Sequence, residues 1–159
     1  MMRVIDVENK YMNKAYNEAK KALKKDEVPV GAVIVKNGEI VACAYNKKEK
    51  NNDPMGHAEI LCIKKACKKL NDWYLKSCEL YVTLEPCVMC CGAIINARIE
   101  KVYFGAMDLK GGALGGLFNL MEQEGFNHYF EYEYLKNDEC GKILKDYFKQ
   151  KRIEKKNSK

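Results

Sequence analysis

The chain has 159 residues, of which 47% are hydrophobic, and its formal net charge is +6. This length is typical of one domain, which buries roughly two thirds of the surface of the unfolded chain. No segment approaches the ~20 apolar residues of a membrane span, and the acidic and amide residues near the N-terminus are unlike the apolar core of a secretory signal. We therefore expect neither a membrane-spanning nor a secreted protein, but a single domain over residues 1–159 in the cytoplasm.

The predicted elements begin with an amphipathic helix over about residues 9–25, where apolar side chains recur at helical spacing. Two β-rich runs follow, and Asn37-Gly38 between them is a strong signal for a hairpin. Later helices alternate with strands, which predicts crossover connections, parallel strands and helices on both faces of an α/β sheet. The expected ranges after the first helix are strands at 31–35 and 40–45, a helix from 57 to 70, a strand at 79–84, a helix from 87 to 97, strands at 101–105 and 129–134, and a helix from 138 to about 155.

Two short motifs carry candidate metal ligands. In Pro86-Cys87-Val88-Met89-Cys90 the two thiols are three residues apart, so on a helix they share one face. Unpaired N–H groups and the positive dipole end at a helix start favour thiolate over thiol. His57, in His57-Ala58-Glu59, also opens a predicted helix after a turn-prone segment. We therefore place a metal between two helix N-termini, held by His57, Cys87 and Cys90.

The donor set indicates a catalytic site. One imidazole and two thiolates leave the fourth position of a tetrahedral zinc ion open, as in catalytic zinc sites. Glu59 is not needed as a ligand and is available to transfer protons. The combination of H-x-E with P-C-x-x-C is typical of zinc deaminases, which replace a ring amino group by oxygen. The predicted reaction is hydrolytic deamination, with Zn²⁺ as cofactor.

Two alternatives compete with a catalytic zinc: a redox-active cysteine pair and a closed structural zinc site. A closed site needs a fourth ligand. Cys91 follows Cys90 directly and points about 100° around the helix, while His128 has no partner at metal-ligand spacing. The other cysteines are expected to be reduced packing residues, and they are Cys43, Cys62, Cys67, Cys78, Cys91 and Cys140.

Two further features surround these motifs. The run Gly111–Gly116 suggests a phosphate loop but lacks the Lys-Ser/Thr ending, so we expect a mobile loop on the substrate side. Glu85, between a strand and a proline, is as consistent with orienting that junction as with touching substrate.

The positive charge is concentrated at the C-terminal end. Residues 136–159 hold nine Lys or Arg and four Asp or Glu, which predicts a basic helix and tail from about residue 136. The segment 147–152 interleaves aromatic and basic side chains, a composition suited to phosphates and stacked bases. An ordinary solvated helix face is equally consistent with this pattern.

Taken together, motifs along nearly the whole chain closely resemble those of the bacterial tRNA-specific adenosine deaminases, in the cytidine/deoxycytidylate deaminase superfamily. The resemblance implies a cytidine-deaminase-like three-layer α/β/α fold with a central mixed sheet of about five strands, in a single zinc-dependent deaminase domain. It further implies a homodimer with one Zn²⁺ per subunit that converts the wobble adenosine of a tRNA anticodon loop to inosine. The matching segments are 27–32, Asn46, 57–59, 83–90, 92–93, 98–99, 104–108, 127–128 and 146–148.

The resemblance assigns zinc binding and proton transfer to the residues already named, and it adds three substrate contacts. Asn46 would hydrogen-bond the extruded base, Asp108 would contact the neighbouring nucleotide backbone, and Phe148 would help to hold the anticodon loop. Each also has a purely structural interpretation: Asn46 as the end of a strand, Asp108 as a turn cap and Phe148 as a helix anchor.

Two other functions are also consistent with the sequence. The same zinc chemistry serves deaminases of free nucleobases or nucleosides of the cytosine or guanine type, and motif spacing does not separate these from an RNA deaminase. A non-catalytic RNA-binding zinc module is the third possibility. The basic C-terminal region and the extent of the resemblance favour tRNA.

Overall fold

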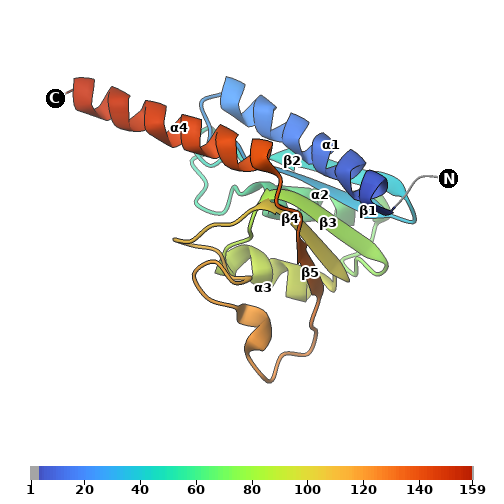
Figure 1. The fold of residues 1–159 in the computed structure, drawn as a ribbon. Coiled ribbons are helices and arrows are strands. Elements are labelled where there is room, and N and C mark those ends of the chain that lie inside the picture. The colour runs from blue at the N-terminus through green and yellow to red at the C-terminus, as the bar shows by residue number, and fades with distance from the viewer. Residues whose placement is uncertain (1–3, 159) are drawn as a thin grey trace.

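The computed structural model describes residues 4–158. A five-stranded mixed sheet lies between two layers of helices (Figure 1), so the predicted three-layer α/β/α architecture is confirmed. The elements in chain order are α1 (Val4–Lys24), β1 (Gly31–Lys36), β2 (Glu39–Tyr45), α2 (Ala58–Leu70), β3 (Cys78–Leu84), α3 (Val88–Ala97), β4 (Lys101–Ala106), the 3₁₀ turn η1 (Leu120–Glu122), β5 (Glu131–Tyr134) and α4 (Asp138–Asn157).

The sheet has the order β2-β1-β3-β4-β5. Strand β1 is antiparallel to both β2 and β3, whereas β4 is parallel to β3 and β5. The predicted hairpin joins β1 and β2, and Asn37 and Gly38 have φ values of 51° and 78°. Positive φ at both central residues is the geometry of a type I′ hairpin turn. Because β2 and β3 both run against β1, they point the same way.

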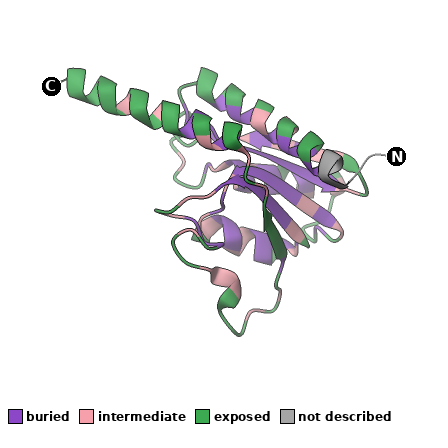
Figure 2. Cartoon of the chain, in the orientation of Figure 1, coloured by how far each residue is buried: buried purple, intermediate pink, exposed green. Residues whose placement is uncertain are grey.

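Helices cover both faces of the sheet. In Figure 1, α1 and α4 lie on one face and α2 and α3 on the other. Strands β1 and β3 are almost wholly buried, and Figure 2 shows the buried residues concentrated along these central strands. Strands covered on both faces have continuous apolar sequences instead of alternation. The hydrophobic core therefore forms two layers, one on each face of the sheet.

Helix α1 lies directly on β1 because its inner face is made of small side chains. Ala15, Ala19 and Ala22 are fully buried, and a Cβ added at Gly31 would overlap the main-chain atoms of Ala15 and Ala19. The helix begins at Val4, earlier than the predicted residue 9, since the same apolar spacing continues back along the sequence. Strand β5 begins later than predicted.

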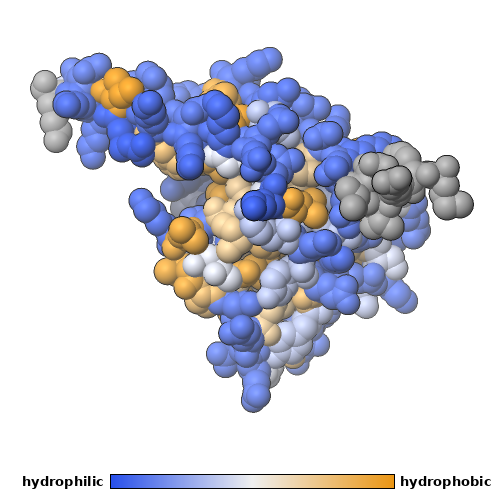
Figure 3. Space-filling model, viewed as in Figure 1, coloured by the Kyte–Doolittle hydropathy of each residue, from blue (hydrophilic) through white to orange (hydrophobic). Residues whose placement is uncertain are grey.

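Helix α4 is anchored at its start and projects at its end. Cys140, Ile143 and Leu144 are buried, whereas the second half extends away from the body of the domain (Figure 1) and its surface is mainly hydrophilic (Figure 3). Lys151 forms an ion pair with Asp26 at 2.7 Å. Within residues 4–158, no helix combines the length and the apolar character needed to cross a bilayer.

The close contact of α1 with β1 gives a stability prediction. Gly31→Ala should lower the free energy of unfolding by about 1–3 kcal/mol, because the added methyl group overpacks this contact. Gly92→Ala is the matched control, since a Cβ there meets nothing within 4 Å on α3 and should raise the free energy of unfolding by about 0.5–1 kcal/mol. Urea denaturation measures both, and equal stability of the two variants would contradict the packing account.

Candidate active site

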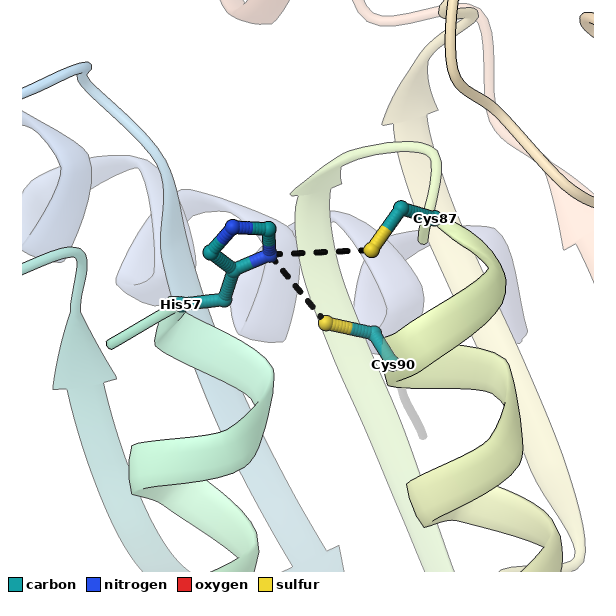
Figure 4. Close-up of side chains that lie close together, drawn as sticks. All are labelled: His57, Cys87 and Cys90. Atoms are coloured by element: carbon teal, nitrogen blue, oxygen red, sulfur yellow. Dashed lines mark hydrogen bonds between the residues drawn. The ribbon is translucent and has the colours of Figure 1, made fainter. Parts of the chain in front are cut away.

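The two candidate metal motifs meet because two helices start at the same edge of the sheet. Parallel strands β2 and β3 end there, and each leads to a helix on the same face. His57 is the N-cap residue of α2 and Cys87 that of α3, both with extended backbone. Neither side chain caps its own helix by a hydrogen bond. Both are therefore free to point into the space between the helix ends (Figure 4).

The imidazole of His57 faces both sulfur atoms. Its Nδ1 lies 3.6 Å from Cys87 Sγ and 3.4 Å from Cys90 Sγ (Figure 4), and the three candidate ligand atoms all lie within 4.8 Å of one another. One nitrogen and two sulfurs at this range suit a zinc ion, which binds histidine and cysteine in tetrahedral sites. The residues present therefore fit a metal that takes three protein ligands.

Within residues 4–158, no fourth Cys, His, Asp or Glu joins this group. The Cys91 thiol donates to the main-chain oxygen of Pro86 at 3.9 Å instead, and a ring nitrogen of His128 lies 2.7 Å from the main-chain oxygen of Ile99. All the cysteines are free, as predicted for those outside the motif. The arrangement thus differs from a closed four-ligand structural site.

Hydrogen bonds link the three candidate ligands His57, Cys87 and Cys90 and shift their pKa values. Hydrogen bonds with Cys90 and, to a smaller extent, with His57 together lower the pKa of Cys87 to about 4, although burial acts in the opposite direction. The same bond with Cys87, followed by burial, raises the pKa of Cys90. The pKa of His57 is raised, chiefly by its hydrogen bond to Cys87. These neighbours therefore favour thiolate at Cys87, and a bound cation would take the place of the protons in these hydrogen bonds.

Glu59 lies in the first turn of α2, two residues after His57, and it is 4% exposed. Burial raises the pKa of its carboxyl group. A carboxylate whose pKa is shifted toward neutrality is suited to both accepting and returning a proton.

A cavity of about 170 Å³ opens beside these residues. A cavity of ~150 Å³ holds one benzene molecule, so this volume fits a single heterocyclic base. Its lining combines apolar walls with a few polar groups, as is usual for small-molecule sites. The lining residues are Val28, Val30, Asn46, Lys48, His57, Ala58, Glu59, Leu84, Glu85, Cys87 and Asp108.

Asn46 and Asp108 lie on the cavity wall and also hold loops. The Asn46 amide donates to Val28 O at 3.2 Å and accepts from Lys48 N–H at 3.1 Å. One N–H and one lone pair of the amide remain for a ligand. Asp108 Oδ1 accepts from the N–H groups of Lys110 and Gly111 at 3.0 and 3.1 Å. The turn-capping interpretation of Asp108 is therefore observed, together with its position at the cavity.

Phe148 lies apart from this cluster. It is 44% exposed on α4, does not line the cavity, and contacts the ring of Tyr147 edge to face at 5.4 Å between centroids. The structure brings the other six predicted site residues to one place and leaves Phe148 outside it.

A buried acid that was not among the predicted site residues also shapes the site. Glu27 is 1% exposed, and its carboxylate accepts from Glu49 N–H at 2.9 Å and Lys50 N–H at 2.7 Å. It thereby fixes the loop that leads to His57. The available signal was an acidic residue directly before the apolar segment Val28-Pro29-Val30.

Comparisons with known proteins agree with this geometry. The family model of the MafB19-like deaminases matches residues 7–152. A tRNA-specific adenosine deaminase of Aquifex aeolicus is 49% identical, over 89% of this chain and 94% of its own. One from Bacillus subtilis is 51% identical, over 92% and 91%. A solved structure from a study of A-to-I editing by tRNA:A34 deaminases aligns with a TM-score of 0.81 and 40% identity, covering 86% of this chain and 99% of that one.

The fold and the site define a deaminase of the MafB19-like class. Within that class, the chain belongs to the family of tRNA-specific adenosine deaminases, and the resemblance found in its motifs is confirmed.

Adjacent cysteines on α3 offer a test of the ligand group. Cys90→Ala should weaken metal binding by at least about tenfold, because a sulfur ligand is lost. Cys91→Ala is the control, since Cys91 is equally buried but turned toward Pro86. Metal content per chain, measured by atomic absorption after dialysis against a weak chelator, compares the two. Equal metal loss in both variants would refute the assigned ligand set.

Proposed function

We propose that this chain deaminates adenosine to inosine at the wobble position of a tRNA anticodon. One observation carries the proposal: a cavity sized for one base has His57, Glu59, Cys87 and Cys90 on or beside its wall, in a member of the tRNA-specific adenosine deaminase family. His57, Cys87 and Cys90 would hold one Zn²⁺ per subunit. The whole of residues 1–159 would then serve as one deaminase domain.

The chemistry requires one water molecule per adenosine and releases one ammonia. Bound zinc would act as a Lewis acid that lowers the pKa of water from ~15.7 toward ~7. Glu59 would accept a proton from the attacking water and return protons to the ring nitrogen and the departing amino group. Its buried position favours this role, because a carboxyl group of raised pKa can both bind and release a proton.

Binding of the base would use the free hydrogen-bonding capacity of Asn46, and Asp108 would contact the adjoining nucleotide. A base in a single-stranded loop is inexpensive to extrude because it is already unpaired. Phe148 lies outside the cavity, so its proposed contact is with RNA around the edited base, by stacking. The proposal also includes a homodimer and a cytoplasmic location.

A deaminase of free bases or nucleosides is the main competitor. Inosine formation in an anticodon stem–loop RNA should be compared with ammonia release from free adenosine, guanine and cytosine. Mass spectrometry of nucleosides from total tRNA, with and without the protein, extends this test to natural substrates. Turnover of a free base without inosine in RNA would overturn the proposal, and RNA binding without any turnover would indicate a non-catalytic module.

Glu59→Gln tests the proton-transfer step. The variant keeps the size of the side chain and the metal ligands, so its metal content should equal that of the wild type. Its rate of inosine formation should fall by about 10²–10⁴-fold, the usual contribution of general acid–base catalysis. Near-normal turnover in a fully metal-loaded variant would remove Glu59 from this role.

Substitutions on the basic surface of α4 test whether this surface contacts the RNA. Lys149 and Arg152 are exposed, whereas Lys151 already pairs with Asp26. Alanine at both exposed positions should weaken tRNA binding and reduce the slope of log K against log salt by about 1–2, one per phosphate contact. Lys68→Ala with Lys69→Ala, at the exposed end of α2, is the control of equal charge. Identical slopes for the two double variants would place the footprint elsewhere.

A further inference from the structure

The run Gly111–Gly116 folds around a carboxylate of the protein itself. Glu85 is 2% exposed. Its Oε1 accepts from Asp108 N–H at 3.0 Å, and its Oε2 accepts from Leu114 N–H at 2.8 Å and Gly116 N–H at 2.9 Å. Several backbone N–H groups aimed at one anion form the kind of cradle that Gly-rich loops commonly build for phosphate. Here the anion in the cradle is a side chain.

Two glycines of the run are required by this packing. A Cβ added at Gly112 would overlap the carboxyl group of Glu85, and one at Gly116 would overlap both that group and the main-chain oxygen of Asp108. Hydrogen bonds to Glu85 thus hold the loop from within at Leu114 and Gly116. The glycines of the sequence motif serve an internal contact.

The Gly111–Gly116 loop also contacts the turn that carries Cys87, one of the candidate metal ligands. Ala113 N–H donates to Pro86 O at 2.9 Å, and Cys87 and Gly112 form an isolated antiparallel bridge. The main chain of Glu85 leads directly into this turn, while its side chain holds the N–H of Asp108. One residue therefore sets the separation between the ligand-bearing turn and the cavity wall opposite.

We propose that Glu85 is a positioning residue whose negative charge anchors the Gly111–Gly116 loop and so holds Asp108 at the cavity wall for substrate RNA. This role rests on the proposed function. A carboxylate has about four lone-pair positions, and three are occupied by backbone donors. Glu85 is consequently set up to fix a loop, whereas proton transfer belongs to Glu59.

Glu85→Gln tests the anchor without using activity. An amide presents only one oxygen, so its NH₂ group must face either the N–H of Asp108 or those of Leu114 and Gly116. Hydrogen exchange of these backbone amides should be at least roughly tenfold faster in the variant, because charge-assisted bonds are lost. Glu18→Gln is the control, since Glu18 is also buried, at 4% exposed, but pairs with Lys21 on α1. Unchanged exchange in a folded Glu85→Gln variant would overturn the anchor.

Kinetics test the positioning role. With an anticodon stem–loop RNA that carries adenosine at the wobble position, Glu85→Gln should raise KM roughly tenfold and change kcat less, because loop and Asp108 contacts bind substrate and transition state alike. Metal content should stay at the wild-type level. A normal KM in the variant would overturn the positioning role. A reduced kcat, together with the loss of one of the two pH-dependent slopes of the pH–kcat profile, would also overturn it and would indicate an acid–base role for Glu85.

Gly112→Ala decides the question if Glu85→Gln does not fold. It leaves the charge in place but pushes the loop off the carboxyl group, so exchange and KM should rise together. Gly141→Ala is its control, because a Cβ there makes only an ordinary contact at 4.0 Å with Ala106 on β4. Wild-type exchange in Gly112→Ala would reject the anchor. Absence of inosine formation by the wild-type chain would instead reject the proposed function, while hydrogen exchange still decides the anchor.

Discussion

The site depends on two helix N-termini that meet at one edge of the sheet. Strands β2 and β3 run in the same direction, and each is followed by a helix on the same face, so α2 and α3 present their first turns side by side. Positive helix ends stabilise nearby thiolate, which offsets part of the cost of taking it out of water. The lowered pKa of Cys87 reflects its neighbours Cys90 and His57 in that same space. Topology thus creates the electrostatic setting before any metal binds.

A second constraint concerns the loops that close the cavity. Irregular backbone carries N–H groups that must find acceptors when buried. Glu27 and Glu85 meet this need for the two loops that flank the helix ends, each with a carboxylate that accepts two or three backbone bonds. Charged acceptors form stronger hydrogen bonds than neutral ones. Two long loops are therefore held in defined shapes although neither contains a strand of the sheet.

Local patterns predicted most of the fold. The hairpin at Asn37-Gly38, the alternation of helices and strands, and the ligand pair on α3 depend on residues close in sequence, and the structure agrees with them. Contacts between residues far apart in the sequence could not be predicted from these local patterns. The bonds of Glu85 span 23 to 31 residues, and the contact between Lys151 and Asp26 spans 125. Neither has a periodicity or motif that reveals it.

Under the proposed function, substrate recognition and loop structure are coupled, because Asn46 and Asp108 would serve both. The Asn46 amide donates one hydrogen bond to Val28 O and accepts one from Lys48 N–H, and Asp108 uses one carboxylate oxygen to cap its own turn. Only the remaining polar atoms are free to face a base or a nucleotide. Replacing either residue changes the cavity wall as well as the contact. If these positions determine specificity as proposed, a substitution there would also change the loops that Asn46 and Asp108 hold.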